Sequence, residues 1–102
     1  MIKMNKIKGL SKIENRFLYL KIENETDLNK NLSNLFKDLK FGKLEDLDLF
    51  YPELDEEYLF ISDKKINLHL FITKKYVHLV IEPLESNMDE VLENVEKHFK
   101  LE

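Results

Sequence analysis

The sequence predicts one α+β domain over residues 1–102, in which a mostly antiparallel sheet and two helices form two layers. Several short segments alternate apolar and polar residues, as half-buried strands do, and two others repeat apolar residues with the helical period. Size agrees, because 102 residues with a 43% hydrophobic content can bury one core. The expected order is β-α-β-β-β-β-α, with both helices on one face of the sheet.

The first half of the chain predicts one strand and one helix. The strand covers residues 17–22, where aliphatic residues alternate with aromatic and charged ones. In the helix that follows, five apolar residues fall on one stripe: Leu28, Leu32, Leu35, Phe36 and Leu39. Asn24 or Thr26 is expected to cap its start, and Gly42 suits its end.

The second half predicts four strands and the second helix. Residues 44–51 form the weakest strand, and the other three are Tyr58–Ser62, Ile66–Thr73 and Tyr76–Glu82. The closing helix is expected to start at Ser86, whose spacing to Asp89 resembles a capping box. Its expected buried stripe is Met88, Val91, Leu92, Val95 and Phe99.

The two ends of the chain are less informative. Residues 1–13 are expected to be either a short strand or a mobile arm. Leu101 and Glu102 could be the remnant of a removed tag, so no inference is drawn from them. The predicted element order is similar to that of the helix-grip or TATA-binding-protein-like fold. This resemblance is one of topology only, so it implies a shape and no activity.

Pairing the strands tests the two-layer prediction. If Asp63-Lys64 and Lys74-Lys75 are two-residue hairpin loops, every facing pair on one side of the sheet is aliphatic. The first hairpin would pair Ile61 with Ile66 and Leu59 with Leu68. The second would pair Ile72 with Val77, Leu70 with Leu79 and Leu68 with Ile81. Neither loop has the glycine or asparagine that such turns prefer, so a longer loop remains an alternative.

The other side of the predicted sheet carries aromatic and histidine side chains where a solvated face would carry Lys, Glu and Thr. Three interpretations stay open. A helix or the N-terminal segment covers this face, the face is a protein interface, or it binds a small ligand or nucleic acid. Phe17 and Tyr19 would join the face if the first strand lies in the same sheet.

Composition excludes several classes of function. The absence of cysteine excludes disulfides, zinc–thiolate sites and cysteine nucleophiles. No apolar run is long enough to span a membrane, and no secretory signal is visible, so a cytoplasmic location is expected. A net charge of −4 disfavours nucleic acid as a partner, because neutralising phosphates needs positive charge.

Catalytic motifs are also missing. His69 and His78 on neighbouring strands, with Glu82 or Tyr58 as a third group, are the best candidates for a metal or for metal-assisted hydrolysis. The acidic run 45–57 is more typical of a solvated loop. No serine has a G-x-S-x-G context, and two isolated glycines exclude a phosphate-binding loop. No catalytic residue, metal or cofactor is therefore expected from the sequence.

The function expected from the sequence is that of a non-catalytic interaction module that forms a homodimer or binds another protein. The residues expected to form its binding surface are Tyr58, Phe60, His69, Phe71, Tyr76 and His78. Binding of a small ligand or nucleic acid on the same face is the alternative.

Overall fold

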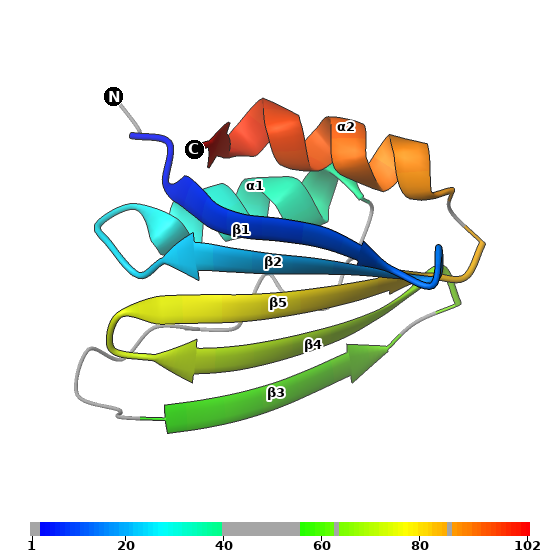
Figure 1. Cartoon of the computed structure of the whole chain (residues 1–102), viewed down its shortest axis with the longest axis horizontal. Helices are drawn as coiled ribbons and strands as arrows, with labels where there is room; N and C mark the ends of the chain where they lie inside the picture. The colour runs from blue at the N-terminus through cyan, green and yellow to red at the C-terminus, as the bar shows by residue number, and fades with distance from the viewer. Residues whose placement is uncertain (1–2, 40–55, 63, 86) are drawn as a thin grey trace.

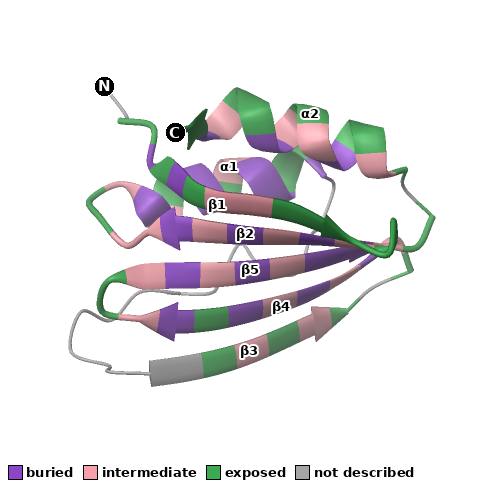
Figure 2. Cartoon of the chain, in the orientation of Figure 1, coloured by how far each residue is buried: buried purple, intermediate pink, exposed green. Residues whose placement is uncertain are grey.

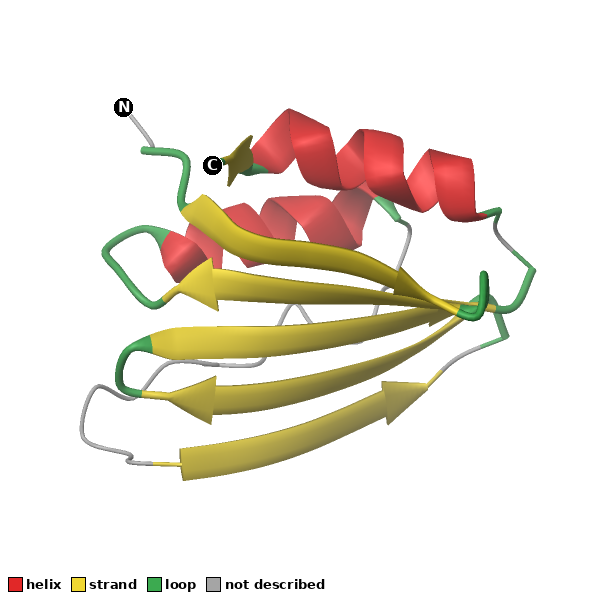
Figure 3. Cartoon of the chain, in the orientation of Figure 1, coloured by secondary structure: helices red, strands yellow, loops and turns green. Residues whose placement is uncertain are grey.

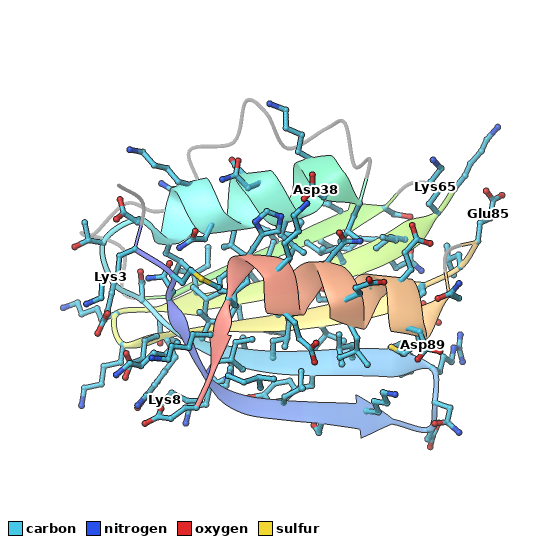
Figure 4. All side chains as sticks on the ribbon, turned by 90° about the horizontal axis from the view of Figure 1, so that it is seen from above. Lys3, Lys8, Asp38, Lys65, Glu85 and Asp89 are labelled. Carbon is cyan, nitrogen blue, oxygen red and sulfur yellow. The ribbon has the colours of Figure 1, made fainter. Side chains whose placement is uncertain are left out.

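Two helices lie on one side of a six-stranded sheet in the computed structural model of the chain (Figures 1, 3 and 4). The structure describes residues 3–39, 56–62, 64–85 and 87–102. The strands in spatial order are β3 (Glu56–Ser62), β4 (Ile66–Thr73), β5 (Tyr76–Pro83), β2 (Phe17–Glu23), β1 (Lys6–Ile13) and β6 (Lys100–Leu101). The helices are α1 (Leu28–Asp38) and α2 (Met88–His98). Every strand pair is antiparallel except β1 with β6.

The α+β class and the mostly antiparallel sheet are confirmed, but the predicted order of elements is not. The described elements run β-β-α-β-β-β-α-β. Residues 6–13 form an eight-residue strand, so of the two alternatives for residues 1–13 the strand is the one observed, and it is longer than expected. The strand predicted over 44–51 lies outside the described residues. The helix-grip topology inferred from the predicted order is therefore not confirmed.

Burial alternates along the central strands, as the sequence pattern requires (Figure 2). Leu20, Leu70 and Leu79 face the helices and are fully buried. Their neighbours along each strand point to the other side of the sheet, and Phe71 there is 47% exposed. We call the helix-covered side the inner face and the opposite side the outer face.

Both predicted helical stripes pack on the inner face. Leu28, Leu32, Leu35 and Phe36 of α1 are buried in the core, as are Val91 and Val95 of α2 and Phe99 after it. Met88 and Leu92 pack against the same core and stay partly exposed. One apolar core therefore lies between the helices and the sheet, which leaves the outer face without a helical layer among the described residues.

The helix starts differ from the prediction. Asp27 occupies the N-cap of α1 with a φ of 72° and makes no side-chain cap hydrogen bond. Asn24 instead donates to the Thr73 carbonyl at 2.8 Å and ties α1's entry to β4. The cap of α2 is Asn87 rather than Ser86, because Asn87 Oδ1 accepts the Glu90 N–H at 2.7 Å.

The two predicted hairpins differ in outcome. The β4–β5 register is confirmed, with Leu70 opposite Leu79. Its Lys-Lys turn lacks glycine, but Thr73 Oγ1 donates to the Tyr76 carbonyl (2.9 Å) and accepts the Tyr76 N–H (3.1 Å).

The predicted β3–β4 register is wrong by two residues. Ile61 faces Leu68 and Leu59 faces Leu70, because Ser62 pairs with Asn67 and leaves a longer loop between them. An even shift leaves each side chain on its predicted face, so the prediction of two unlike faces survives this error.

The hairpin between β1 and β2 turns through two consecutive left-handed residues. Glu14 and Asn15 have φ values of 54° and 53°, and the Arg16 N–H donates to the Ile13 carbonyl at 3.0 Å. Two central residues with positive φ are the mark of a type I′ turn, whose twist suits a tight hairpin.

Buried amides anchor the segment before β1. Asn5 and Asn31 are 2% and 3% exposed. Asn31 donates to the Lys3 carbonyl (2.7 Å) and to Asn5 Oδ1 (2.6 Å), while Asn5 donates to the Thr26 carbonyl (3.1 Å). These bonds fix the segment against the start of α1, so it is not a free arm.

The last residues complete the edge of the sheet beside β1. Leu101 pairs with Ile7, and the Glu102 N–H donates to the Ile7 carbonyl at 3.2 Å. Lys8, labelled in Figure 4, forms ion pairs with Glu102 and Glu23. Hydrogen bonds to these two carboxylates raise the pKa of Lys8. Leu101 and Glu102 therefore contribute structural contacts at this edge.

Within the described ranges, neither helix is long and apolar enough to cross a membrane.

Candidate functional site: the outer face of the sheet

All six residues expected to form a binding surface lie on the outer face, on three adjacent strands. They are Tyr58 and Phe60 on β3, His69 and Phe71 on β4, and Tyr76 and His78 on β5. Cross-strand pairing places Tyr58 opposite Phe71, and Phe71 opposite His78. The alternation that buries the aliphatic residues also brings these rings together.

The rings of β3 and β4 form the exposed part of the surface, which we call the edge cluster (Tyr58, Phe60, His69 and Phe71). Tyr58 is 50% exposed, Phe60 52% and Phe71 47%. Ring centroids are 4.6 Å apart for Tyr58 and Phe71 and 4.7 Å apart for Phe60 and His69. The Tyr58 hydroxyl and His69 Nδ1 are hydrogen-bonded at 2.7 Å. These contacts hold the aromatic rings in place while leaving half of their surface accessible.

A second group of rings lies over β5 and β2 and is more covered. The Tyr19 hydroxyl and His78 Nδ1 are hydrogen-bonded at 2.6 Å, with the rings stacked at 5.9 Å. Tyr76 lies 6.4 Å from His78, and Lys21 Nζ lies 4.2 Å from the Tyr76 centroid. Burial, and then the charge of Lys21, lowers the pKa of His78 below its ordinary value of 6.5. The neutral imidazole is therefore favoured here.

Polar residues close the outer face at the end near the β3–β4 loop. Glu82 is 6% exposed and accepts hydrogen bonds from Asn67 (2.9 Å) and Arg16 (2.5 Å). Ser62 donates to Asn67 at 2.6 Å. Hydrogen bonds from Asn67 and then Arg16 hold the pKa of Glu82 below its usual 4.5. The network joins β3, β4, β5 and the entry to β2.

The groups proposed from the sequence for metal chemistry do not converge. Each histidine uses Nδ1 for a tyrosine, and Glu82 is bonded to Asn67 and Arg16. No group of three metal-ligating side chains occurs among the described residues. The acidic run 45–57 belongs mostly to the part of the chain that the structure does not describe, so its role is not addressed.

The structure divides the six predicted residues into two groups and adds two more residues. Tyr58, Phe60 and Phe71 are exposed and contact the partly buried His69 in the edge cluster, whereas Tyr76 and His78 pack with Tyr19 and Lys21. The alternation in strand 17–22 had already placed Tyr19 as a conditional member of the face. Nothing in the sequence indicated its pairing with His78, because that contact depends on β2 lying next to β5.

Comparison with models of protein families found no matching family, and searches of curated proteins and of solved structures found no significant match either.

Proposed function

We propose that this protein is a non-catalytic interaction module that binds a second copy of itself through the outer face of its sheet. The observation that supports this most is the exposure of three large aromatic side chains in one contiguous cluster. Tyr58, Phe60 and Phe71 each leave about half of their surface accessible. Contiguous exposed apolar surface is uncommon on monomers, and aromatic residues are enriched where proteins bind one another.

Covering these rings supplies a large part of the binding free energy. Fully burying a side chain such as Phe is worth roughly 1.5–3 kcal/mol, so covering half of each of three rings contributes a few kcal/mol per copy. In a symmetric dimer both copies contribute the same cluster, which doubles this gain. The exposed Ser62 and the partly exposed Asn67 place polar groups beside the rings, as at the rim of an interface.

The edge cluster also loses little side-chain freedom on binding. The hydrogen bond between Tyr58 and His69 fixes the tyrosine, and Phe60 and Phe71 each contact a neighbouring ring. Side chains already ordered in the free protein lose less entropy when a partner covers them. The order of these exposed rings therefore supports a binding role for the edge cluster.

Replacing Phe71 with glutamate tests the proposal. The Phe71→Glu variant is expected to remain folded, because the side chain is 47% exposed, and to dimerise at least tenfold more weakly. Sedimentation velocity from about 1 to 500 µM would measure the dimer, across the micromolar affinities of modest interfaces. Far-UV circular dichroism would report the fold.

Leu84→Glu is the matched control, because Leu84 is 50% exposed and lies beyond the end of β5. It introduces the same charge at similar exposure and is expected to leave dimerisation unchanged. A wild-type protein that stays monomeric throughout this range, or a Phe71→Glu variant that dimerises as well as wild type, would contradict the proposal.

A further inference from the structure

Three rows of residues cross the outer face from β3 to β1, because the registers of these five strands follow one another. Paired residues of neighbouring strands project from the same face of a sheet. The first row is Tyr58, Phe71, His78, Lys21 and Gly9. The second row is Phe60, His69, Val80, Tyr19 and Ser11. The third row begins at Ser62 on β3 and ends at Ile13 on β1.

The two ends of each row differ in the size of their side chains. Every row has one large apolar end and one small end: Tyr58 with Gly9, Phe60 with Ser11, and Ile13 with Ser62. The large ones, Tyr58, Phe60 and Ile13, are 50%, 52% and 46% exposed. Turning a second copy of the face about its centre line therefore places each large side chain over a small one.

The centre line of the outer face is β5, which presents no uncompensated charge at neutral pH. Val80 is apolar, and burial lowers the pKa of His78, which favours its neutral form. Glu82 is 6% exposed and ion-paired with Arg16. On a two-fold axis each residue faces its own copy, so an uncompensated charge there would be repelled. β5 therefore suits a symmetry axis better than β2, whose Lys21 would face a second lysine.

We propose that the two copies pack face to face about a two-fold axis along β5, so that the β3–β4 half of each outer face covers the β1–β2 half of the other. This rests on the proposed self-association and specifies its geometry. Tyr58 then lies over Gly9 of the second copy. Phe71 lies over Lys21 of the second copy, where the ring can contact the aliphatic stem of the lysine and its charge.

Even packing between the two sheets favours this axis over one at right angles to the strands. Facing sheets lie about 10 Å apart, and large side chains opposite small ones fill that space without voids. The other axis would place β3 on β3 and β1 on β1. Rings would then meet rings, while Gly9 and Ser11 faced each other and left a gap that forfeits packing contacts.

The area that a dimer needs also favours overlap of whole faces. The three half-exposed rings of the edge cluster offer roughly 300 Å² per copy. A standard interface buries about 800 Å² per partner, so contact between two edge clusters alone would be small. In the proposed arrangement each copy buries both its edge cluster and its β1–β2 half. The contact then spans the roughly 19 Å from β3 to β1.

Exchanging a large and a small side chain tests the arrangement. Tyr58→Ala removes a ring, and Gly9→Tyr places a ring where that of the second copy would lie. Each variant is expected to dimerise at least tenfold more weakly in sedimentation velocity. In the double variant the ring and the small residue have changed places, so it is expected to dimerise at least tenfold more tightly than the two separate losses predict. Losses that simply add would overturn the arrangement.

The fold is expected to accept a side chain at position 9. A Cβ on Gly9 would lie 3.6 Å from the Lys21 Cβ, an ordinary contact, and Gly9 does not have a positive φ. Lys12→Tyr is the matched control, because Lys12 is exposed on the same strand and points away from the outer face. It is expected to dimerise as wild type does, and far-UV circular dichroism would report the fold of each variant. Equal weakening by Lys12→Tyr and Gly9→Tyr would count against the arrangement.

A spin label tests the arrangement without changing the outer face. The chain contains no cysteine, so Lys12→Cys provides a single attachment site. The labelled protein would be mixed with ¹⁵N-labelled wild type, in which paramagnetic broadening falls steeply with distance from the label. Because β1 of one copy lies over β3 of the other, the amides of Tyr58 and Phe60 are expected to broaden at least fivefold more than those of Gly9 and Ser11.

The outcomes separate this inference from the proposed function. A dimer with stronger broadening on β3 than on β1 supports both. A dimer in which β1 broadens as much as β3, or more, overturns this arrangement and leaves association through the aromatic rings standing. A protein that remains monomeric throughout overturns both.

Discussion

Two tyrosine–histidine pairs repeat the same local geometry on the outer face. Tyr58 bonds to His69 at 2.7 Å, and Tyr19 bonds to His78 at 2.6 Å. In both pairs the partners are diagonal neighbours on adjacent strands, because Tyr58 lies opposite Phe71 and Tyr19 opposite Val80. Long ring-bearing side chains can reach this diagonal distance. Residue types alone predict that these groups share a face, but the choice of diagonal partner depends on register.

The turn residue Glu14 holds a conformation that glycine adopts more easily. Its φ of 54° places a side chain with a Cβ in the left-handed region, which costs roughly 1–2 kcal/mol. We predict that Glu14→Gly stabilises the protein by about 1 kcal/mol, after the greater loss of backbone freedom of glycine is included. Urea unfolding would measure the change.

Glu14→Ala is the control for this prediction. It removes the same carboxylate but keeps the Cβ, so no stabilisation is expected. Equal gains from the alanine and glycine variants would assign the effect to charge rather than to backbone conformation.

At the scale of elements, the periodic patterns predicted the helices well but located their starts poorly. All five apolar residues predicted for the stripe of α1 are buried. Four of them lie within the helix, and Leu39 directly follows its end. The cap of α2 is one residue later than expected, at Asn87. Both Ser86 and Asn87 are good cap residues by type, so only backbone geometry distinguishes them.

Removing the Asn87 cap is expected to destabilise the protein. Asn87→Ala leaves the Glu90 N–H without its side-chain acceptor, which costs about 1 kcal/mol. Ser86→Ala should have the smaller effect, because Asn87 already fills the capping position. Thermal unfolding of the two variants checks the order, and a larger loss for Ser86→Ala would place the cap at the serine.

The C-terminal ends of α1 and α2 contact each other through charged side chains. Asp38 at the end of α1 lies beside α2 in Figure 4 and contacts His98 at 2.6 Å and Lys97 at 3.3 Å. A carboxylate at a helix C-terminus is unfavourable by itself. Hydrogen bonds from His98 and then Lys97 lower the pKa of Asp38, and the two basic residues lie at the end of α2 where cations are favoured. The pair therefore fastens the two helix ends together.

At the scale of the whole molecule, the nearly buried Glu82 of β5 accepts hydrogen bonds from Asn67 of β4 and from Arg16, which precedes β2, at one end of the sheet. Its pKa lies below 4.5 in the folded protein, so the folded state favours the ionised form. A depressed pKa contributes stability that is present above the unfolded value and is lost as pH falls through the folded value. Acid should therefore weaken this end of the sheet.

We predict that Glu82→Gln is less stable than wild type at pH 7 and that the difference shrinks below about pH 4.5. The glutamine is close in size and cannot ionise, so it mimics the protonated acid. Urea unfolding at fixed low protein concentration would measure both proteins, which keeps self-association out of the comparison. A difference that is independent of pH would contradict the assigned role of the carboxylate.

Much of the candidate site could be predicted because strand alternation needs no knowledge of pairing. The period of two fixed which residues share a face with Phe71, and an even error in the β3–β4 register did not change it. The division of the site into exposed and covered rings could not be predicted. It depends on β2 inserting beside β5, a contact between residues about 60 positions apart.

Local patterns in the sequence determined the two helices, the strands β2 to β5, the two unlike faces of the sheet and the aliphatic composition of its core, because periodicity acts between near neighbours. The tertiary structure alone decided the strand order, the anchoring of residues 3–5 against α1 and the closing of the β1 edge by β6. It also decided that β3 lies at the other edge with β4 as its described neighbour. These features depend on which distant segments meet, and such meetings are set by the packing of the whole chain around one core.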